Sequence, residues 1–147
     1  MKTDYPYLAQ SLASLSGLPV RHYVDERFQG LYHQAKFKPD LAIIEEKHIF
    51  QAQSPVSYYM DENLLCYGLL RIPTDDVALL AGPVAQLRID RNAAGRILRR
   101  IGEPLTRTTE LLNYFSVMPT YPLQNFLQIL CTIHYFVNGT KLDVSEL

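Results

Sequence analysis

The stretch that decides the fold runs from Pro55 to Val84 and reads PVSYYMDENLLCYGLLRIPTDDVALLAGPV. It holds two apolar runs, 64–72 and 77–84, joined by Pro73-Thr74-Asp75-Asp76. Strand-length apolar runs on either side of a short connection of turn-forming residues predict a β-hairpin. Upstream, 55–60 followed by Asp61-Glu62-Asn63 predicts a further strand and turn.

Both faces of the predicted hairpin are apolar, and Arg71 is the only charge in its first strand. Alternation divides that strand into two sets of side chains. One set is Leu64, Cys66, Gly68, Leu70 and Ile72, and the other is Leu65, Tyr67 and Leu69. A strand that is apolar on both sides does not suit a water-exposed edge, so we expect the hairpin to be central and covered by other elements.

Length and composition describe one folded domain, 1–147. The 147 residues are 48% hydrophobic and 20% charged, with a net charge of −1, which is typical of a globular protein and argues against nucleic acid as its main partner. The two cysteines, Cys66 and Cys131, lie inside apolar runs and are expected to be core thiols, which favours a reduced, cytoplasmic setting. No run approaches the length of a membrane span, so we expect no membrane contact.

The elements before the hairpin follow from local signals. Apolar spacing with Asp4 as N-cap predicts a helix over 4–17, with Tyr5, Leu8, Leu12 and Leu15 as its stripe. Strands are expected over 20–24 and 28–33, with a turn at 25–27, although Gln29-Gly30 is also compatible with a bulge or with the turn itself. A helix capped by Asp40 is predicted over 41–50, with Glu45-Glu46-Lys47 on its solvent side.

Three helices are predicted after the hairpin. The segment 88–107 contains six arginines against Asp90 and Glu103, a local charge of +4. It predicts an amphipathic helix with Asp90 as N-cap, Gly102 as its stop and an apolar stripe of Ile89, Ala93, Ile97 and Ile101. A short helix over 106–116 follows, and the last helix, from Leu123 to Asn138, has the strongest helical periodicity of the chain. The first two resemble a helix-turn-helix, but the second lacks a polar, base-reading face, so a solvated arginine face is favoured over DNA contact.

The resulting order is one helix, two strands, one helix, three strands and three helices. This order predicts an α+β fold with a central antiparallel sheet of about five strands, flanked by helices and with a helical C-terminal end. PAS-like and GAF-like sensor domains have this kind of build.

The candidate ligand-binding residues are Tyr58, Tyr59, Tyr67 and Arg71. Their hydroxyls and guanidinium are suited to anchor a small molecule in a pocket, but cross-strand packing is the favoured interpretation. The four histidines and two cysteines show no metal-ligand spacing, so no metal or other cofactor is expected. His134 is expected to be a hydrogen-bonded core histidine.

Several segments together resemble the N-terminal sensor region of AraC-type regulators from Gram-positive bacteria. They are SLSGLPVRHYVDE, PVSYYMDENLLCYGLLRI, VALLAGPV, LTRTTELLNYFSVMP and LQNFLQILCTIHYFVNGTKLDVSEL, in this order over nearly the whole chain. The resemblance implies a PAS/GAF-like regulatory domain of a longer transcription regulator, whose two helix-turn-helix units would follow Leu147. No ligand-binding motif carries over, because such regions are not tied to one effector.

Three hypotheses follow. The first is an effector-sensing, homodimerising and non-catalytic regulatory domain, which contacts DNA only through a C-terminal domain and responds to an unidentified small molecule. The second is a dimerisation or protein-interaction module with a filled interior and no small-molecule ligand. The third, the least favoured, is a small cytoplasmic enzyme that uses Cys66 or a histidine, for which no motif supplies a nucleophile with its base.

Overall fold

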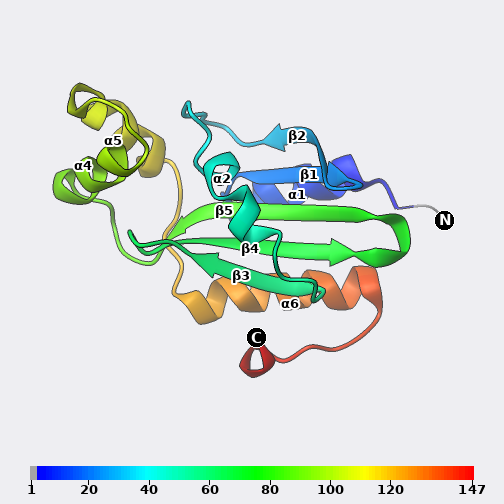
Figure 1. Ribbon diagram of the computed structural model, residues 1–147. Helices are drawn as coiled ribbons and strands as arrows, with labels where there is room; N and C mark the ends of the chain where they lie inside the picture. Colours follow the sequence, from blue (N-terminus) through cyan, green and yellow to red (C-terminus); the bar gives the residue numbers. More distant parts are fainter. Residues whose placement is uncertain (1–2) are drawn as a thin grey trace.

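The computed structural model describes residues 3–147, and it places a five-stranded antiparallel sheet at the centre (Figure 1). The strand order is β2-β1-β5-β4-β3, and all neighbours run antiparallel. The strands are β1 (Val20–Val24), β2 (Arg27–Tyr32), β3 (Val56–Met60), β4 (Leu65–Ile72) and β5 (Val77–Ala85). The predicted α+β class, with about five antiparallel strands and a helical C-terminal end, is confirmed.

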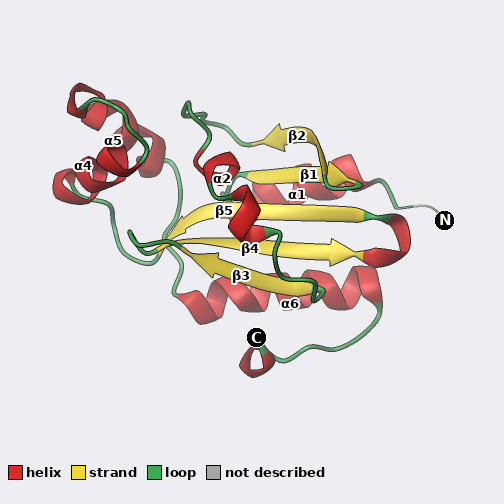
Figure 2. Cartoon of the chain, in the orientation of Figure 1, coloured by secondary structure: helices red, strands yellow, loops and turns green. Residues whose placement is uncertain are grey.

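Helices cover both faces of this sheet (Figures 1 and 2). They are α1 (Tyr5–Ser16), α2 (Leu41–Ile44), α3 (Glu46–Ile49), α4 (Arg91–Arg100), α5 (Thr108–Ser116) and α6 (Leu123–Asn138). Short 3₁₀ turns span Pro73–Asp75, Leu105–Arg107 and Val144–Glu146. Within residues 3–147, none of these helices has the length and apolar character needed to traverse a bilayer.

The predicted hairpin forms the middle of the sheet, with β5 as the central strand and β4 beside it. Every residue of β5 is buried, and in β4 only Arg71 is partly exposed. The two predicted side-chain sets of β4 do face opposite ways, because Tyr67 and Leu69 belong to one core cluster and Cys66 and Leu70 to the other. Leu64 is the exception: it lies in the turn before β4 with a φ of 63° and is 62% exposed.

The N-terminal elements also form where they were predicted. Asp25 and Glu26 both have positive φ values, which makes a tight turn between β1 and β2. Gln29 is the extra residue of a bulge, because the register passes from Tyr23–Phe28 to His22–Gly30. In α1 the predicted stripe is partly wrong, since Leu15 is 88% exposed. The buried residues of this helix are Ala9, Leu12, Ala13 and Ser16.

The predicted helix over 41–50 breaks into α2 and α3, and Asp40 caps α2 as expected. The prediction that 45–47 faces solvent is wrong for Glu45, which is only 3% exposed. The break at Glu45 turns its carboxylate inward, where it pairs with Arg100 of α4. The periodicity of an unbroken helix over 41–50 would leave Glu45 on the solvent side, so it could not predict this burial.

The sheet separates two hydrophobic cores. One lies under α1 and α6, and the other under α2, α3, α4 and α5. In α4 the buried side chains are Ala94, Ile97 and Leu98, so the predicted stripe was correct only at Ile97 among the residues of the helix itself. The predicted apolar face of α6 is confirmed, with Phe126, Leu127, Leu130, Cys131 and His134 buried.

Candidate functional site

The four predicted ligand-binding residues do not share one face of the sheet. Tyr59 and Tyr67 are cross-strand partners on the face covered by α2 to α5, and Arg71 follows on the same face of β4. Tyr58 pairs with Gly68 on the opposite face, which carries α6, and is 40% exposed. The structure therefore brings three of the four residues to one side and leaves Tyr58 on the other.

The space in front of Tyr67 is filled with side chains. Tyr67 is 1% exposed inside the larger core, and burial raises the pKa of its hydroxyl well above the ordinary value. Tyr59 stacks on the ring of His48, with 5.2 Å between the centroids. This packing is what the structural interpretation of the aromatic residues predicts.

The guanidinium of Arg71 donates its hydrogen bonds to backbone carbonyls of the same chain. Its Nε donates to the carbonyl of Ala52 at 3.1 Å and its Nη2 to the carbonyl of Phe50 at 3.1 Å, while the guanidinium lies 5.3 Å from the centre of the Phe50 ring. A further contact of 3.3 Å joins it to the exposed Glu26. Arg71 thus anchors the segment that leads from α3 into β3.

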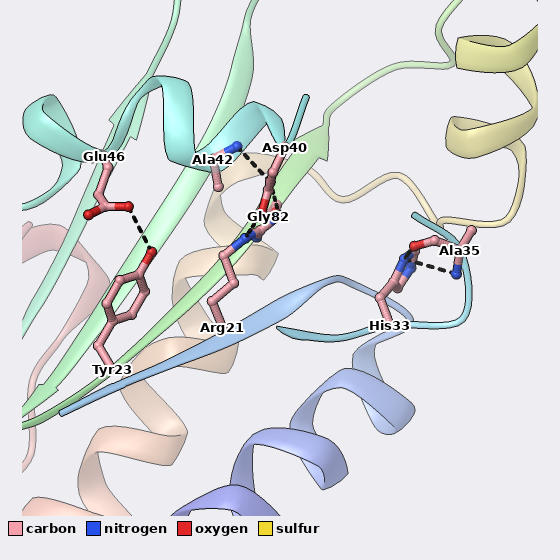
Figure 3. A network of polar contacts seen from close by, with 8 residues as sticks. All are labelled: Arg21, Tyr23, His33, Ala35, Asp40, Ala42, Glu46 and Gly82. Carbon is pink, nitrogen blue, oxygen red and sulfur yellow. Dashed lines mark hydrogen bonds and ion pairs between the residues drawn. The ribbon is translucent and has the colours of Figure 1, made fainter. Parts of the chain in front are cut away.

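The most developed polar arrangement on this face is centred on Arg21 of β1 (Figure 3). Arg21 is 1% exposed, and its guanidinium makes a two-point contact with the carboxylate of Asp40, through Nε at 2.7 Å and through Nη2. Its Nη1 donates to the carbonyl of Gly82 in β5 at 2.7 Å. One buried cation therefore joins two strands of the sheet to the N-cap of α2.

Further polar contacts extend this network. The Tyr23 hydroxyl donates to Glu46 at 3.2 Å, as Figure 3 shows, and burial raises the pKa of Tyr23 above its ordinary value. Glu45 accepts from Nη2 of Arg100 at 2.5 Å, and Nη1 of Arg100 lies 3.8 Å from Asp61. These contacts link α2 and α3 to β1, and α4 to the turn before β4. The amino-acid sequence alone did not predict this network.

Asp61 gives the network a dependence on pH. Burial, with a smaller effect of the neighbouring Glu45, raises the pKa of the Asp61 carboxyl despite its bonds from the amides of Leu65 and Asn63 and the nearby Arg100. The folded state consequently binds a proton more readily than the unfolded state, so protonation of Asp61 favours folding as the pH falls from neutral towards about 4.

We therefore expect Asp61→Asn to have a higher free energy of unfolding than the wild type at neutral pH. This difference in stability should shrink as the pH falls towards about 4. The amide oxygen of asparagine can still accept from Asn63 and Leu65, which donate to Asp61 Oδ1 at 2.8 and 3.0 Å. Urea denaturation of both proteins across this range measures the difference. A difference in unfolding free energy that stays constant with pH would contradict the account.

Neither thiol is placed for nucleophilic chemistry. Cys66 is 1% and Cys131 3% exposed, and burial raises the pKa of Cys66 to about 12. A thiolate is the reactive form, so the native protein should react with a thiol-directed disulfide reagent at mildly alkaline pH about 10³-fold more slowly at Cys66 than a free cysteine does. Unfolding in urea should expose both thiols. Fast labelling of native Cys66, with Cys131→Ser used to isolate its signal, would instead support the enzyme hypothesis.

Histidines are dispersed over the fold. His134 is a core residue as predicted, with Nδ1 2.8 Å from the Asn138 amide and Nε2 3.1 Å from the Thr140 hydroxyl. Within residues 3–147, no three His, Cys, Asp or Glu side chains are grouped in a way that could hold a metal ion.

The hollows of the surface lie elsewhere. One is a groove between the end of β5 and α5, and another lies between α4 and the 3₁₀ turn that precedes α5. The latter is lined by Arg91, Arg96 and Arg99. None of the four predicted ligand-binding residues lines either hollow.

Comparison with known proteins gave no match to a family model, and no curated protein or solved structure is significantly similar to this chain.

Proposed function

We propose that this chain is an effector-sensing, dimerising and non-catalytic regulatory domain of an AraC-type bacterial transcription regulator, and that it works in the cytoplasm. The observation that supports this most is the architecture: an antiparallel sheet in the order β2-β1-β5-β4-β3, closed by helices on both faces. This is the build expected of a PAS- or GAF-like sensor. DNA would be read by a separate domain after Leu147.

In this proposal the last helix responds to changes in the sheet, and its close packing on β4 supports that role. Gly68 of β4 lets α6 approach closely, because a Cβ at this position would come within 2.7 Å of Cζ of Phe126. The buried side of α6 packs on β4 and β3, and the chain continues from α6 to Leu147. In this proposal the effector favours one arrangement of the domain, and α6 carries the resulting population shift towards the DNA-reading part.

A second copy of the chain is the proposed partner. The two helices that cover one face of the sheet, α1 and α6, keep large apolar side chains in water. Leu15 of α1 is 88% exposed, and Phe136 of α6 is 76% exposed beside Tyr135. Exposed apolar residues also lie on other elements, such as Leu87 at 80%, so the proposal rests on Leu15 and Phe136 belonging to the two helices of one layer. A net charge of −1 gives little self-repulsion between copies.

The filled space around Tyr67 favours a second candidate, a dimerisation or interaction module with no small-molecule ligand. Tyr67, Leu69 and Leu80 are each at most 1% exposed between the sheet and its helices. A ligand would then have to bind at a surface hollow. This candidate needs no effector, and its partner is a second copy of the chain or another protein.

The coding sequence beyond Leu147 tests the regulator proposal. Two helix-turn-helix units directly downstream would support it. A stop codon at that point would rule out a DNA-reading domain on the same chain and overturn the proposal.

A further inference from the structure

One face of α4 lines a hollow with three arginines. The hollow has a volume of about 390 Å³ and lies between α4 and the start of the following 3₁₀ turn and α5. Arg91, Arg96 and Arg99 line it together with the polar Asn92, and the rest of the lining is Gly95, Leu105 and Thr108. No carboxylate is among these lining residues, so the hollow carries a concentrated positive charge in a chain whose net charge is −1.

Two of the other arginines of segment 88–107 have carboxylate partners. Arg100 contacts Glu45, and Arg107 contacts Glu103 and Glu110. Among the residues that the structure describes, no ion pair joins Arg91, Arg96 or Arg99 to an acidic side chain. Arg88 also has no ion pair among the described residues, but it lines the groove at the end of β5 instead. The three lining arginines are therefore a cluster of cations that the fold leaves available at one hollow.

The positions of Arg91 and Arg96 are unfavourable for α4 alone, whereas Arg99 lies in the last turn, where the helix dipole favours a cation. Arg91 is the first residue of the helix, where the helix dipole favours negative charge. Arg96 repels Arg99 at i+3 and Arg100 at i+4. All three lining arginines are exposed, so they gain little from packing in return. A bound anion would remove each of these unfavourable interactions.

We propose that this hollow binds a small polyphosphate, that is, a di- or triphosphate group, either free or as part of a nucleotide. Guanidinium groups form two-point contacts with phosphate oxygens, and three of them balance most of the negative charge of such a group. The Asn92 side chain adds a hydrogen-bond donor. The anion would then be the effector of the regulatory domain. This effector role rests on the proposed function, but the binding of the anion does not.

Calorimetric titration of the whole chain with sodium tripolyphosphate at low salt tests this site. Saturable one-to-one binding that weakens as salt is added is expected. Arg96→Gln should weaken binding by about tenfold or more, and Arg96→Lys should lose less because it keeps the charge. Arg27→Gln is the matched control, since Arg27 is an exposed arginine of β2 far along the chain from the hollow, and it should leave binding unchanged.

Three results would overturn the site. The first is no saturable binding up to about 1 mM tripolyphosphate, a concentration at which even weak ligands bind. The second is a loss of affinity in Arg27→Gln equal to that in Arg96→Gln, and the third is tighter binding of duplex DNA than of tripolyphosphate at the same ionic strength, which would assign the arginines to nucleic acid. Sedimentation of the same samples separates the two proposals. Self-association without tripolyphosphate binding would overturn this site and leave the regulatory domain standing.

Discussion

Replacing Asp40 by alanine should lower the free energy of unfolding by about 3 kcal/mol or more. The change leaves the guanidinium of Arg21, which is 1% exposed, without its counter-charge between the sheet and α2. It also removes the cap of α2, because Asp40 accepts from the amide of Ala42 at 3.1 Å. Asp40 itself is 18% exposed, so the lower end of the range known for broken buried ion pairs is expected. Urea denaturation measures the loss.

Asp90→Ala is the matched control for this prediction. Asp90 also caps its helix, α4, and accepts from the amide of Ala93 at 2.8 Å. It is exposed and forms no ion pair with an arginine within residues 3–147, so its loss should cost about 1 kcal/mol. The double variant Arg21→Met with Asp40→Ala should be more stable than Asp40→Ala alone, because it removes the unpaired charge. Equal losses for Asp40→Ala and Asp90→Ala would show that the ion pair contributes nothing.

Gly82→Ala should be comparably damaging, at about 3 kcal/mol. Gly82 has a φ of 124°, and a Cβ there would lie 2.7 Å from the carbonyl oxygen of Cys66, a backbone atom of the neighbouring strand. The strain and the clash add, because β4 and β5 cannot separate without breaking the centre of the sheet. The midpoint of denaturation measures the effect.

Gly139→Ala isolates the backbone part of that effect. Gly139 ends α6 with a φ of 77° and has nothing within 4 Å of the added Cβ, so its substitution should cost only about 1 kcal/mol. If Gly82→Ala and Gly139→Ala lower the free energy of unfolding equally, the close approach of β4 and β5 at Gly82 contributes nothing to the loss of stability.

Much of the fold was predictable because its signals are local. Alternation along 64–72 separates Tyr67 from Cys66, and the caps Asp4, Asp40 and Asp90 mark the starts of three helices. Alternation along β3 also bears on the predicted ligand-binding residues. Tyr58 and Tyr59 are consecutive in a strand, so they must point to opposite faces and cannot both join Tyr67.

The charged network could not be predicted in this way because its partners are distant in the chain. Arg21 and Asp40 are 19 positions apart, and Glu45 meets Arg100 only because the helix breaks and α4 returns to the same end of the sheet. Because Glu45 is followed by two more charged residues, Glu46 and Lys47, its sequence context predicts a surface position. For the same reason, sequence could not tell which of the six arginines would be neutralised and which would be left facing a hollow.

Sedimentation equilibrium of the wild type and of Phe136→Ser tests the proposed dimerising regulatory domain most directly. The account predicts that the wild type forms a dimer and that Phe136→Ser shifts it towards the monomer, since Phe136 is 76% exposed on α6. Phe28→Ser is the matched control, because Phe28 is 48% exposed on β2, away from α6, and its substitution should leave the dimer intact. A wild type that stays monomeric at the highest attainable concentration would contradict the account.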